Sequence, residues 1–408
     1  MAHRQSLALL FPAAIVSINL IVFLPSVASA APVDLAKTGQ TTCYSQTGSL
    51  VDCTGSGQDG EYQKGIPWPD PRFTNNADGT ITDNLTGLTW LADTECVGRV
   101  KWLDALVAVN QLANGSCELS DGSAVGDWRM PNYLELISLA NLGVPRVDTW
   151  YASFGFTNSE SYGRGYWSST STTQGASSVA GYQFRDRFSG SSSKGGTYQT
   201  WPVKGISTGP AKIWRTGQVV CYDDTGTVID CAGTGQDGDL QMGEPMPVTR
   251  FTDNADGTVT DNLTGLTWLR NANCFGPRIW SDALSDANNL ADGSCGLSDG
   301  SSAGDWRLPN PMEIVSLTDF SRSQPMIPAG NPFTNVPTFN PSLYHWTSSN
   351  WLVAPQYTYM GGTTALGYYT NADKANAEFL GVWPVRDGGI SQPDPVFENG
   401  FEGEDIPD

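Results

Sequence analysis

The stretch RFTDNADGTVTDNLTGLTWL, which runs from Arg250 to Leu269, repeats an earlier stretch, RFTNNADGTITDNLTGLTWL, from Arg72 to Leu91. The copies differ at two positions, and the offset between Arg72 and Arg250 is 178 residues. Each of the first four cysteines recurs at the same offset: Cys43 as Cys221, Cys53 as Cys231, Cys96 as Cys274, and Cys117 as Cys295. A period this long is not that of a solenoid repeat. The sequence therefore predicts a tandem duplication of one whole domain.

The first 30 residues have the pattern of an export signal. Arg4 supplies positive charge, residues 7–27 are mostly apolar, and Ala28-Ser29-Ala30 is a small-residue cleavage site. An uncleaved membrane anchor is the rival interpretation, because the apolar run approaches spanning length. We expect cleavage after Ala30 and a mature chain that is secreted, periplasmic or on the cell surface, without membrane insertion.

The charge of the chain limits its partners. The sequence holds 42 acidic and 22 basic residues, which gives a formal net charge of −20. This much negative charge repels nucleic acids, anionic membranes and sulfated polymers, because their binding depends on neutralising phosphate or sulfate. We therefore expect no nucleic-acid binding.

The cysteines predict disulfides that close short loops. Within each copy their spacing is ten residues, then a long gap, then 21 residues. A duplicated domain should repeat its pairing, so we expect the bonds Cys43–Cys53, Cys96–Cys117, Cys221–Cys231 and Cys274–Cys295. A zinc cluster is the rival interpretation, but the sequence has no C-x-x-C and the spacings do not fit.

The repeat also predicts where the domains lie. We expect a signal peptide at 1–30, a first domain at 38–204, a linker at 205–215, a second domain at 216–388 and an acidic, disordered tail at 389–408. Beyond about Gly143 and Ser321 the copies stop resembling each other until the short landmarks near their ends. Ligand specificity is expected to differ in these long-loop regions.

Several elements can be placed within each copy. Residues around Cys43 and Cys53 predict a hairpin that turns at 46–48, matched in the second copy by a turn at 224–226. Apolar residues at helical spacing predict a helix that starts near Trp102, and another near Trp280. The DWRMPN and DWRLPN segments predict second helices whose N-terminal capping boxes pair Asn132 with Glu135 and Asn310 with Glu313. Trp90 and Trp268 are expected to face the core.

These motifs carry a resemblance to a known family. The segments DNADGTVTDNLTGLTWL, DWRLPN, the W-x-S-S strand and the closing VWPVRDG are similar to the DUF1566 family, named also for the C-terminal domain of the Legionella collagen-like adhesin. The resemblance covers nearly all of both copies. It implies an α+β fold of two tandem C-type-lectin-like domains. Each would be a small antiparallel sheet flanked by two helices, with long loops and two disulfides.

The resemblance also implies extracellular binding. The family's namesake binds sulfated glycosaminoglycans and promotes adhesion as a trimer. This chain has no collagen-like repeat and is strongly acidic, so a neutral glycan or a protein surface is the better expectation, and its oligomeric state stays open. We predict an exported, non-catalytic binding or adhesion protein. The alternatives are a structural or assembly component of the cell envelope that binds no glycan and, third, a hydrolase that uses carboxylates.

Catalytic groups are hard to assemble from this sequence. Beyond the predicted signal peptide there is one histidine, His345, which argues against a Ser-His-Asp triad or a histidine-rich metal site. The chemistry of formylglycine-generating enzymes, whose W-R-L-P segment is similar, needs cysteines late in the domain, and none follows Cys295. Asp127 and Asp305 are interpreted as part of a turn cap or structural ion pair. We therefore predict no enzyme activity.

Aromatic and basic residues in the variable regions are the candidate ligand-binding residues. Aromatic rings stack on sugar rings and anchor protein interfaces, although alternating tyrosines are also ordinary core residues of strands. The candidates are Trp351, Tyr357, Tyr359, Tyr368, Tyr369, Tyr182, Arg185, Arg187 and Tyr198.

A calcium site is the one cofactor that the sequence leaves open. Oxygen-bearing residues alternate around a glycine in the repeated block, at Asn76, Asp78 and Asp83 and at Asn254, Asp256 and Asp261. The loop lacks the glutamate that an EF-hand places at its twelfth position, so the signal is weak. Turn formation is the favoured interpretation, because Asx-Gly sequences form turns without a metal.

Overall fold

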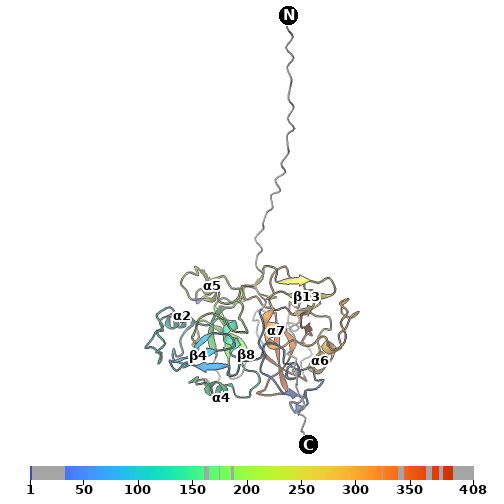
Figure 1. Cartoon of the computed structure of the whole chain (residues 1–408), viewed down its shortest axis with the longest axis horizontal. Helices are drawn as coiled ribbons and strands as arrows, with labels where there is room; N and C mark the ends of the chain where they lie inside the picture. The colour runs from blue at the N-terminus through green and yellow to red at the C-terminus, as the bar shows by residue number, and fades with distance from the viewer. Residues whose placement is uncertain are drawn as a thin grey trace.

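The computed structural model describes Met1 and residues 33–388, except for residues 160–164, 174, 185–187, 324, 339–343, 364–369 and 376–379. The predicted signal peptide and acidic tail lie outside this part of the chain. Two halves of similar build lie side by side, the first made by residues 72–204 and the second by residues 250–386 (Figure 1). Among the described residues, no helix has the length and apolar character to cross a membrane.

Each half contains a four-stranded antiparallel sheet that starts in the repeated block. In the first half its strand order is β3-β4-β5-β9, and in the second it is β12-β13-β14-β18. The strands are β3 (Phe73–Asn75), β4 (Thr80–Asp83), β5 (Thr89–Leu91), β9 (Val203–Lys204), β12 (Phe251–Asp253), β13 (Thr258–Asp261), β14 (Thr267–Leu269) and β18 (Val385–Arg386). Gly87 and Gly265 turn the chain between strands at φ of 78° and 72°, the positive φ that favours glycine.

Each half also contains a three-stranded antiparallel sheet, in the order β6-β7-β8 or β15-β16-β17. Its strands are β6 (Tyr166–Ser171), β7 (Ser178–Gln183), β8 (Phe188–Ser193), β15 (Tyr344–Asn350), β16 (Tyr357–Gly362) and β17 (Thr370–Asp373). The helices of the halves are α2 (Trp102–Asn110), α3 (Tyr133–Ser138), α4 (Val147–Ala152), α6 (Trp280–Asn288) and α7 (Pro311–Ser316).

The four helices that the sequence predicted, α2, α3, α6 and α7, are present. Trp102, Ala105 and Val109 are buried along one side of α2, as the helical spacing requires. Helix α3 begins with a complete capping box: the Asn132 side chain accepts the Glu135 N–H, and the Glu135 carboxylate accepts the Asn132 N–H. Helix α7 repeats this box and has Pro311 in its first turn.

Tryptophan pairs form the centre of each half. Trp90 packs edge-to-face on Trp201 at 5.8 Å between ring centroids, and Trp268 packs on Trp383 at 5.6 Å. All four rings are almost completely buried, which confirms the predicted core role of Trp90 and Trp268. The main core includes buried residues of both halves. Between the halves, the ring centroids of Tyr133 and Phe320 are 5.1 Å apart.

Two hairpin segments lie outside these halves in the sequence, at residues 33–68 and 211–246. The first hairpin segment holds β1 (Cys43–Tyr44), β2 (Leu50–Val51) and α1 (Asp59–Tyr62). The second holds β10 (Cys221–Tyr222), β11 (Val228–Ile229) and α5 (Asp237–Leu240). The predicted turns are present, with Gly48 and Gly226 at φ of 84° and 89°.

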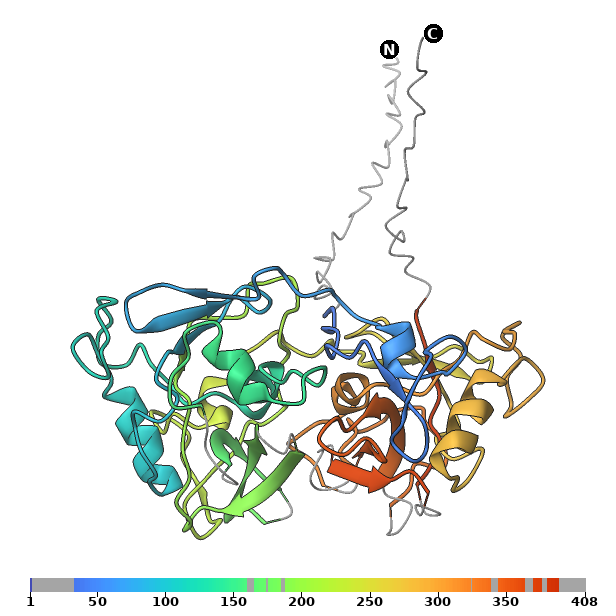
Figure 2. The same cartoon turned by 90° about the horizontal axis from the view of Figure 1, so that it is seen from below.

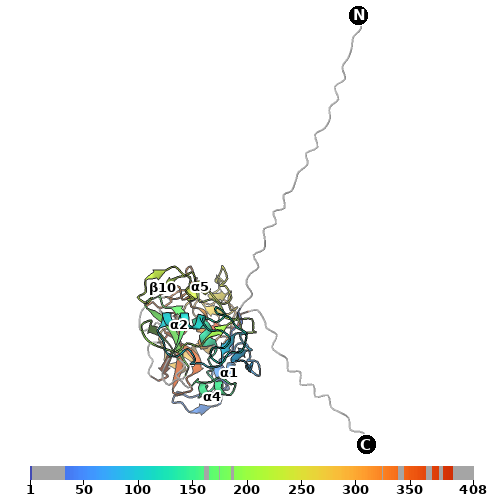
Figure 3. The same cartoon turned by 90° about the vertical axis from the view of Figure 1, so that its left-hand side faces the viewer.

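The hairpin and short helix of each segment pack on the half that does not directly follow the segment in the sequence. Those of the first segment pack on the second half, and those of the second segment pack on the first half. In Figure 2 the blue α1 and its hairpin lie beside the orange and red strands of the second half, and Figures 1 and 3 both place α5 near α2 of the first half. The side chain of Tyr62 donates to Asn288 of α6 at 3.0 Å. The predicted domains, 38–204 and 216–388, group each segment with the half that follows it in the sequence. In space the two segments are exchanged.

The architecture is α+β in two repeated halves, as expected. All four predicted disulfides are present: Cys43–Cys53, Cys96–Cys117, Cys221–Cys231 and Cys274–Cys295. The first and third close the two hairpins, and the others join the loops before and after α2 and α6. These bonds fit a protein of the periplasm or the cell exterior, where disulfides persist.

Candidate functional site

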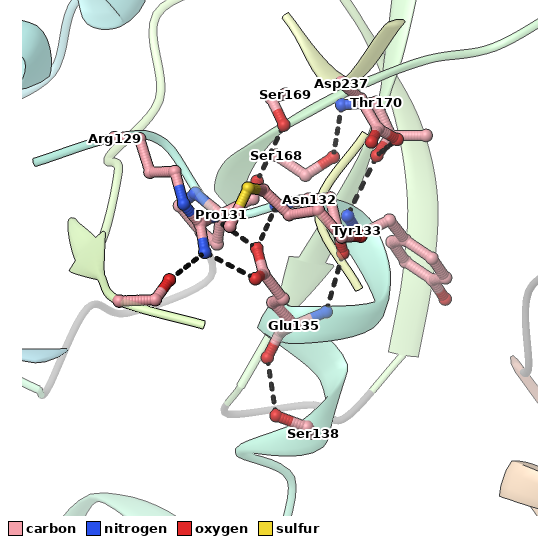
Figure 4. Close-up of polar contacts among 12 residues, drawn as sticks. Arg129, Pro131, Asn132, Tyr133, Glu135, Ser138, Ser168, Ser169, Thr170 and Asp237 are labelled. Carbon is pink, nitrogen blue, oxygen red and sulfur yellow. Dashed lines mark hydrogen bonds and ion pairs between the residues drawn. The ribbon is translucent and has the colours of Figure 1, made fainter. Parts of the chain in front are cut away.

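The most elaborate polar site in each half receives the exchanged hairpin segment. In the first half it begins at the Trp-Arg-x-Pro-Asn motif, where Arg129 forms two hydrogen bonds of 2.6 Å with the Glu135 carboxylate (Figure 4). The same carboxylate accepts the Asn132 N–H at 2.9 Å. The Asn132 side-chain amide also donates to the Met242 carbonyl of the second hairpin segment at 3.1 Å. The motif thus starts a helix and holds the docked segment at once.

Buried hydroxyl groups line the strand that faces the hairpin segment. Ser168, Ser169, Thr170 and Ser171 are all nearly or fully buried in β6. The hydroxyl of Thr170 accepts the Tyr133 N–H at 2.9 Å and donates to the Asp237 carboxylate at 2.7 Å (Figure 4). A buried polar strand is stable only when its groups have partners, and here the hairpin segment supplies several of them.

The hairpin segment contributes a fully buried carboxyl group. Asp237 is the first residue of α5 and accepts the hydroxyls of Thr216 and Thr170 at 2.6 and 2.7 Å. Burial raises the pKa of this carboxyl to about 6, against the lowering effect of the two hydroxyl donors. The Asp237 carboxyl group is therefore about half ionised near pH 6.

The second half repeats this site with the first hairpin segment. Asp59, the first residue of α1, accepts the hydroxyls of Thr38 and Ser349 at 2.5 Å each. Burial raises its pKa to about 6 as well, again against two hydroxyl donors. Arg307 binds Glu313 through two hydrogen bonds, as Arg129 binds Glu135.

Two buried lysines hold the backbones of the hairpins. Lys194 donates to the carbonyls of Tyr222 and Asp223 at 3.3 and 2.9 Å. Lys374 donates to the carbonyls of Tyr44 and Ser45 at 3.4 and 3.2 Å. Burial lowers the pKa of Lys194 to about 8 and that of Lys374 to about 7. Each hairpin is therefore clamped by an aspartate of its own and a lysine of the receiving half.

His345, the one histidine beyond the predicted signal peptide, has the surroundings of a core residue. Its side chain is fully buried, 5.2 Å from the Trp383 ring, and burial lowers its pKa to about 4. It is a neutral core residue where the first half has Tyr166. Asp127 and Asp305 cap turns by accepting the N–H of Ala124 and Ser302 at 2.8 Å, so the turn-cap interpretation is correct.

The predicted ligand residues separate into four groups. Tyr182 and Tyr359 are fully buried, so their predicted role in ligand binding is wrong: on these strands they face the core. Tyr198 is half-buried and packs against the Trp167 ring at 4.6 Å. Trp351 and Tyr357 lie together in the second half. The candidates Arg185, Arg187, Tyr368 and Tyr369 lie outside the described residues.

The repeated block does not form the weak calcium site that the sequence left open. Asp83 is buried and accepts the guanidinium of Arg72 through both oxygens, and Asp261 is held in the same way by Arg250. The remaining candidates form turns. Asp78 and Asp256 accept the N–H of Thr80 and Thr258, while Asn76 and Asn254 donate to the hydroxyls of the same threonines. Among the described residues, no group of three or more His, Cys, Asp or Glu is arranged to hold a metal ion.

The buried aspartates Asp59 and Asp237 were not among the predicted site residues, although the sequence contains a signal for them. Gly-Gln-Asp-Gly occurs at 57–60 and again at 235–238, and Thr-Gly-Gln at 38–40 and again at 216–218. The side-chain amide of Gln58 accepts the Tyr44 N–H and donates to the Tyr44 carbonyl, and Gln236 binds the backbone of Tyr222 in the same way. Turn formation alone does not require the same polar residues in both copies of a glycine-rich segment. Their identity therefore indicates specific side-chain contacts.

Comparison with known families agrees with the repeated architecture. A family model described as the Lcl C-terminal domain matches residues 79–204 and 257–386, which together make up more than half of the chain. The matched stretches cover all but the first seven residues of each half, and both hairpin segments lie outside them. Comparison with curated proteins and with solved structures gives no match. The chain belongs to the Lcl C-terminal domain family, with two copies of that domain in tandem.

Proposed function

We propose that this protein is an exported binding or adhesion protein without catalytic activity, and that it recognises a neutral glycan or a protein surface. The observation that carries the proposal is a contrast within the chain. The hairpin-docking sites are the same in both halves nearly bond for bond, whereas the loops beside them differ in their residues. A framework that is kept twice under dissimilar loops is typical of binding proteins.

The best candidate surface is the loop between β15 and β16. Trp351 and Tyr357 are both half-buried and pack edge-to-face, with 5.8 Å between their ring centroids. The first half has Thr172 and Ser178 at the equivalent positions. In both loops the N–H of the first residue, Trp351 or Thr172, donates to the carbonyl of the second, Tyr357 or Ser178. The backbone of the loop is shared, and the aromatic pair belongs to the second half.

The first hairpin segment supports this loop from one side. A Cβ placed on Gly48 at the hairpin tip would lie 2.8 Å from the Gln356 nitrogen, so the tip is packed directly against the loop. A surface built from a disulfide-closed hairpin and a short strand connection is preorganised, which lowers the entropy cost of binding. The aromatic pair can then present ring surface to a ligand at a fixed position.

The net charge favours an uncharged ligand on this surface. At −20 the whole molecule repels a sulfated polymer, although the family's namesake binds one. A neutral glycan offers the C–H faces of its sugar rings to Trp351 and Tyr357 without this repulsion.

A glycan array probed with the full-length exported protein tests the proposal. We expect retention on neutral glycans, and about 30-fold weaker binding for Trp351→Ala, the loss expected of an aromatic anchor. Val353→Ala is the matched control, because Val353 is 46% exposed in the same loop and lies outside the aromatic pair. Binding only to sulfated glycans, or equal binding by both variants, would contradict the proposed surface.

A pull-down with the same variants separates the two ligand classes. Capture of defined surface proteins that is lost in Trp351→Ala would assign the loop to a protein ligand. Neither glycan nor protein binding by the wild-type chain would favour a structural component of the envelope.

We also infer that each half has a C-type-lectin-like fold. Two helices beside small antiparallel sheets, long connections between α3 and β6 or α7 and β15, and a closing Trp-Pro-Val strand support this relationship. The test is a crystal structure of the protein: superposition on a C-type lectin should align the helices and the closing strand in the same order.

A further inference from the structure

Lys374 lies in an environment that differs from that of its counterpart Lys194 in one decisive contact. Its side chain follows β17, is fully buried, and places Nζ 4.2 Å from the centroid of the Trp280 ring. Besides the two hairpin carbonyls, Nζ contacts the side-chain Oδ1 of Asn350 at 2.5 Å. Asn350 ends β15 and is itself fully buried.

We propose that Lys374 and Asn350 become joined by an intramolecular isopeptide bond. The Nζ lone pair attacks Cγ of Asn350, the new Cγ–Nζ amide bond forms, and the bond between Cγ and Nδ2 breaks. One proton of the amine passes to Nδ2, which leaves as ammonia. No oxidant, reductant or external acyl donor is needed, because one amide replaces another.

The site meets the main requirements of this reaction. The attacking amine must be neutral, and burial lowers the pKa of Lys374 to about 7, so a large fraction is neutral at physiological pH. The Asn350 amide is held in one orientation, because its Nδ2 donates to the Gln58 Oε1 at 2.7 Å while Oδ1 faces the lysine. This geometry keeps the reacting groups together, which is worth many orders of magnitude in effective concentration.

A group that can carry the proton is linked to Asn350 by hydrogen bonds. The Asp59 carboxylate accepts the Thr38 hydroxyl, the Thr38 hydroxyl oxygen accepts the Gln40 N–H, and the Gln40 side-chain oxygen accepts the Asn350 N–H. Asp59 follows Gln58 in the chain and accepts the hydroxyl of Ser349, the residue before Asn350. Burial raises the pKa of the Asp59 carboxyl to about 6, so that it is able to take up and release a proton near neutral pH. We assign the proton transfer to Asp59.

The first half provides an internal control. Lys194 is equally positioned over the Trp102 ring, at 4.2 Å, and binds its hairpin in the same way. The residue equivalent to Asn350 is Ser171, whose hydroxyl offers no acyl carbon to an amine. The proposal therefore predicts one such bond in the molecule, located in the second half.

The bond would fasten the sheet on which the first hairpin docks. Asn350 ends β15 and Lys374 follows β17, and β16 lies between these strands in the sheet. A covalent link between them closes the three strands at the end where Tyr44 and Ser45 are bound. The hairpin and the aromatic loop would then rest on a cross-linked support.

Intact-mass measurement of the full exported chain, reduced and denatured, tests the proposal. We expect a mass lower than that of the processed sequence by one ammonia, and after proteolysis a branched peptide that joins Asn350 to Lys374. Lys374→Arg and Asn350→Ser should both restore the full mass. Asn350→Ser installs the residue of the first half, so it should be tolerated by the fold.

Two outcomes would overturn the bond. A wild-type chain of full mass shows that the contact is only a hydrogen bond. Loss of ammonia that persists in Lys374→Arg shows instead that an asparagine has cyclised onto its own backbone, which also releases ammonia without involving the lysine. Asp59→Asn addresses the proton carrier: unchanged bond formation would remove Asp59 from the mechanism and leave the cross-link itself intact.

Discussion

The two hairpin-docking sites are nearly identical, while the loops beside them share little beyond their backbone path. In both sites a buried aspartate accepts two hydroxyls, one from its own segment and one from the receiving strand. The adjacent loops place Trp351 and Tyr357 in the second half and Thr172 and Ser178 in the first. The shared contacts are those that hold the molecule together, and the differing residues belong to the surface proposed for ligand binding.

The docking sites differ in how deeply their ion pairs are buried. The side chain of Arg307 is 6% exposed and gains a further contact with Asp387 at 3.1 Å. The side chain of Arg129 is 11% exposed and donates instead to the Gly205 carbonyl. The second site is therefore the more tightly closed of the two.

The largest effect should come from breaking this ion pair in the second half. Arg307→Met leaves the buried Glu313 carboxylate without its cation, which should lower the free energy of unfolding by about 4 kcal/mol. Arg129→Met should cost less, because solvent reaches that pair more easily. Urea unfolding of both variants measures the difference.

Arg278→Met is the matched control for this comparison. The side chains of Arg278 and its partner Asp286 are 38% and 32% exposed, so solvent screens the pair and its loss should change stability by less than about 1 kcal/mol. Equal losses from Arg307→Met and Arg278→Met would show that the docking motif is not a centre of stability.

The disulfides should have the next largest effect. Replacing Cys96 and Cys117 by serine opens a loop with a sequence separation of 21, and the added freedom of the unfolded chain should cost about 3 kcal/mol. Replacing Cys43 and Cys53, with a separation of 10, should cost about 0.6 kcal/mol less by the same reasoning. Thermal unfolding of the two double variants decides whether loop length or hairpin docking controls the loss. A greater loss for the shorter loop would mean that docking dominates.

Much of the framework could be predicted because its causes are local. The cysteine pairing, the capping boxes at Asn132 and Asn310, and the hairpin turns at 46–48 and 224–226 each depend on residues close together in the chain. The burial of Trp90 followed from its place in a strand of the repeated block. These predictions were confirmed because neighbouring residues determine them almost alone.

The exchange of the hairpin segments could not be predicted in this way. Asp59 and Ser349 are 290 residues apart, and no periodicity in either segment states which half it contacts. The burial of Tyr182 and Tyr359 was missed for a related reason. An alternating strand has two faces, and the sequence alone does not reveal that the face with these tyrosines is covered by the core.

The buried aspartates should make hairpin docking stronger at acid pH. Their pKa in the folded protein is about 6, above the ordinary value of 3.8, so the folded state binds protons more tightly than the unfolded chain. The contribution of these two carboxyl groups to the free energy of unfolding is fully present below about pH 4 and is lost as the pH rises through 6. Each site could contribute at most about 3 kcal/mol over this range.

Urea unfolding between pH 4 and 7 separates the two aspartates when each variant is compared with the wild type. The comparison is needed because the lowered pKa of the buried His345 makes stability rise with pH over the same range. Asp59→Asn and Asp237→Asn should each remove about half of the component that falls with rising pH, and the double variant should remove it entirely. Unchanged pH dependence in the double variant would assign the effect to other carboxyl groups. A larger share for one residue would show that the two docking sites are less alike than their contacts suggest.

The smallest effect should come from an exposed position that both halves share. Ala77 and Ala255 are exposed and have φ of 59° and 61°, a left-handed conformation that costs a residue with a Cβ about 1–2 kcal/mol. Glycine removes this strain but adds freedom to the unfolded chain, which costs about 0.5–1 kcal/mol. Ala77→Gly and Ala255→Gly should therefore each stabilise the protein by about 0.5 kcal/mol, as measured by thermal unfolding. Both turns are held in the same way, since the alanine N–H donates to the side chain of Asn75 or Asp253. The two gains in stability should therefore be equal. Unequal gains would show that the two copies of the repeated block differ in stability at this turn.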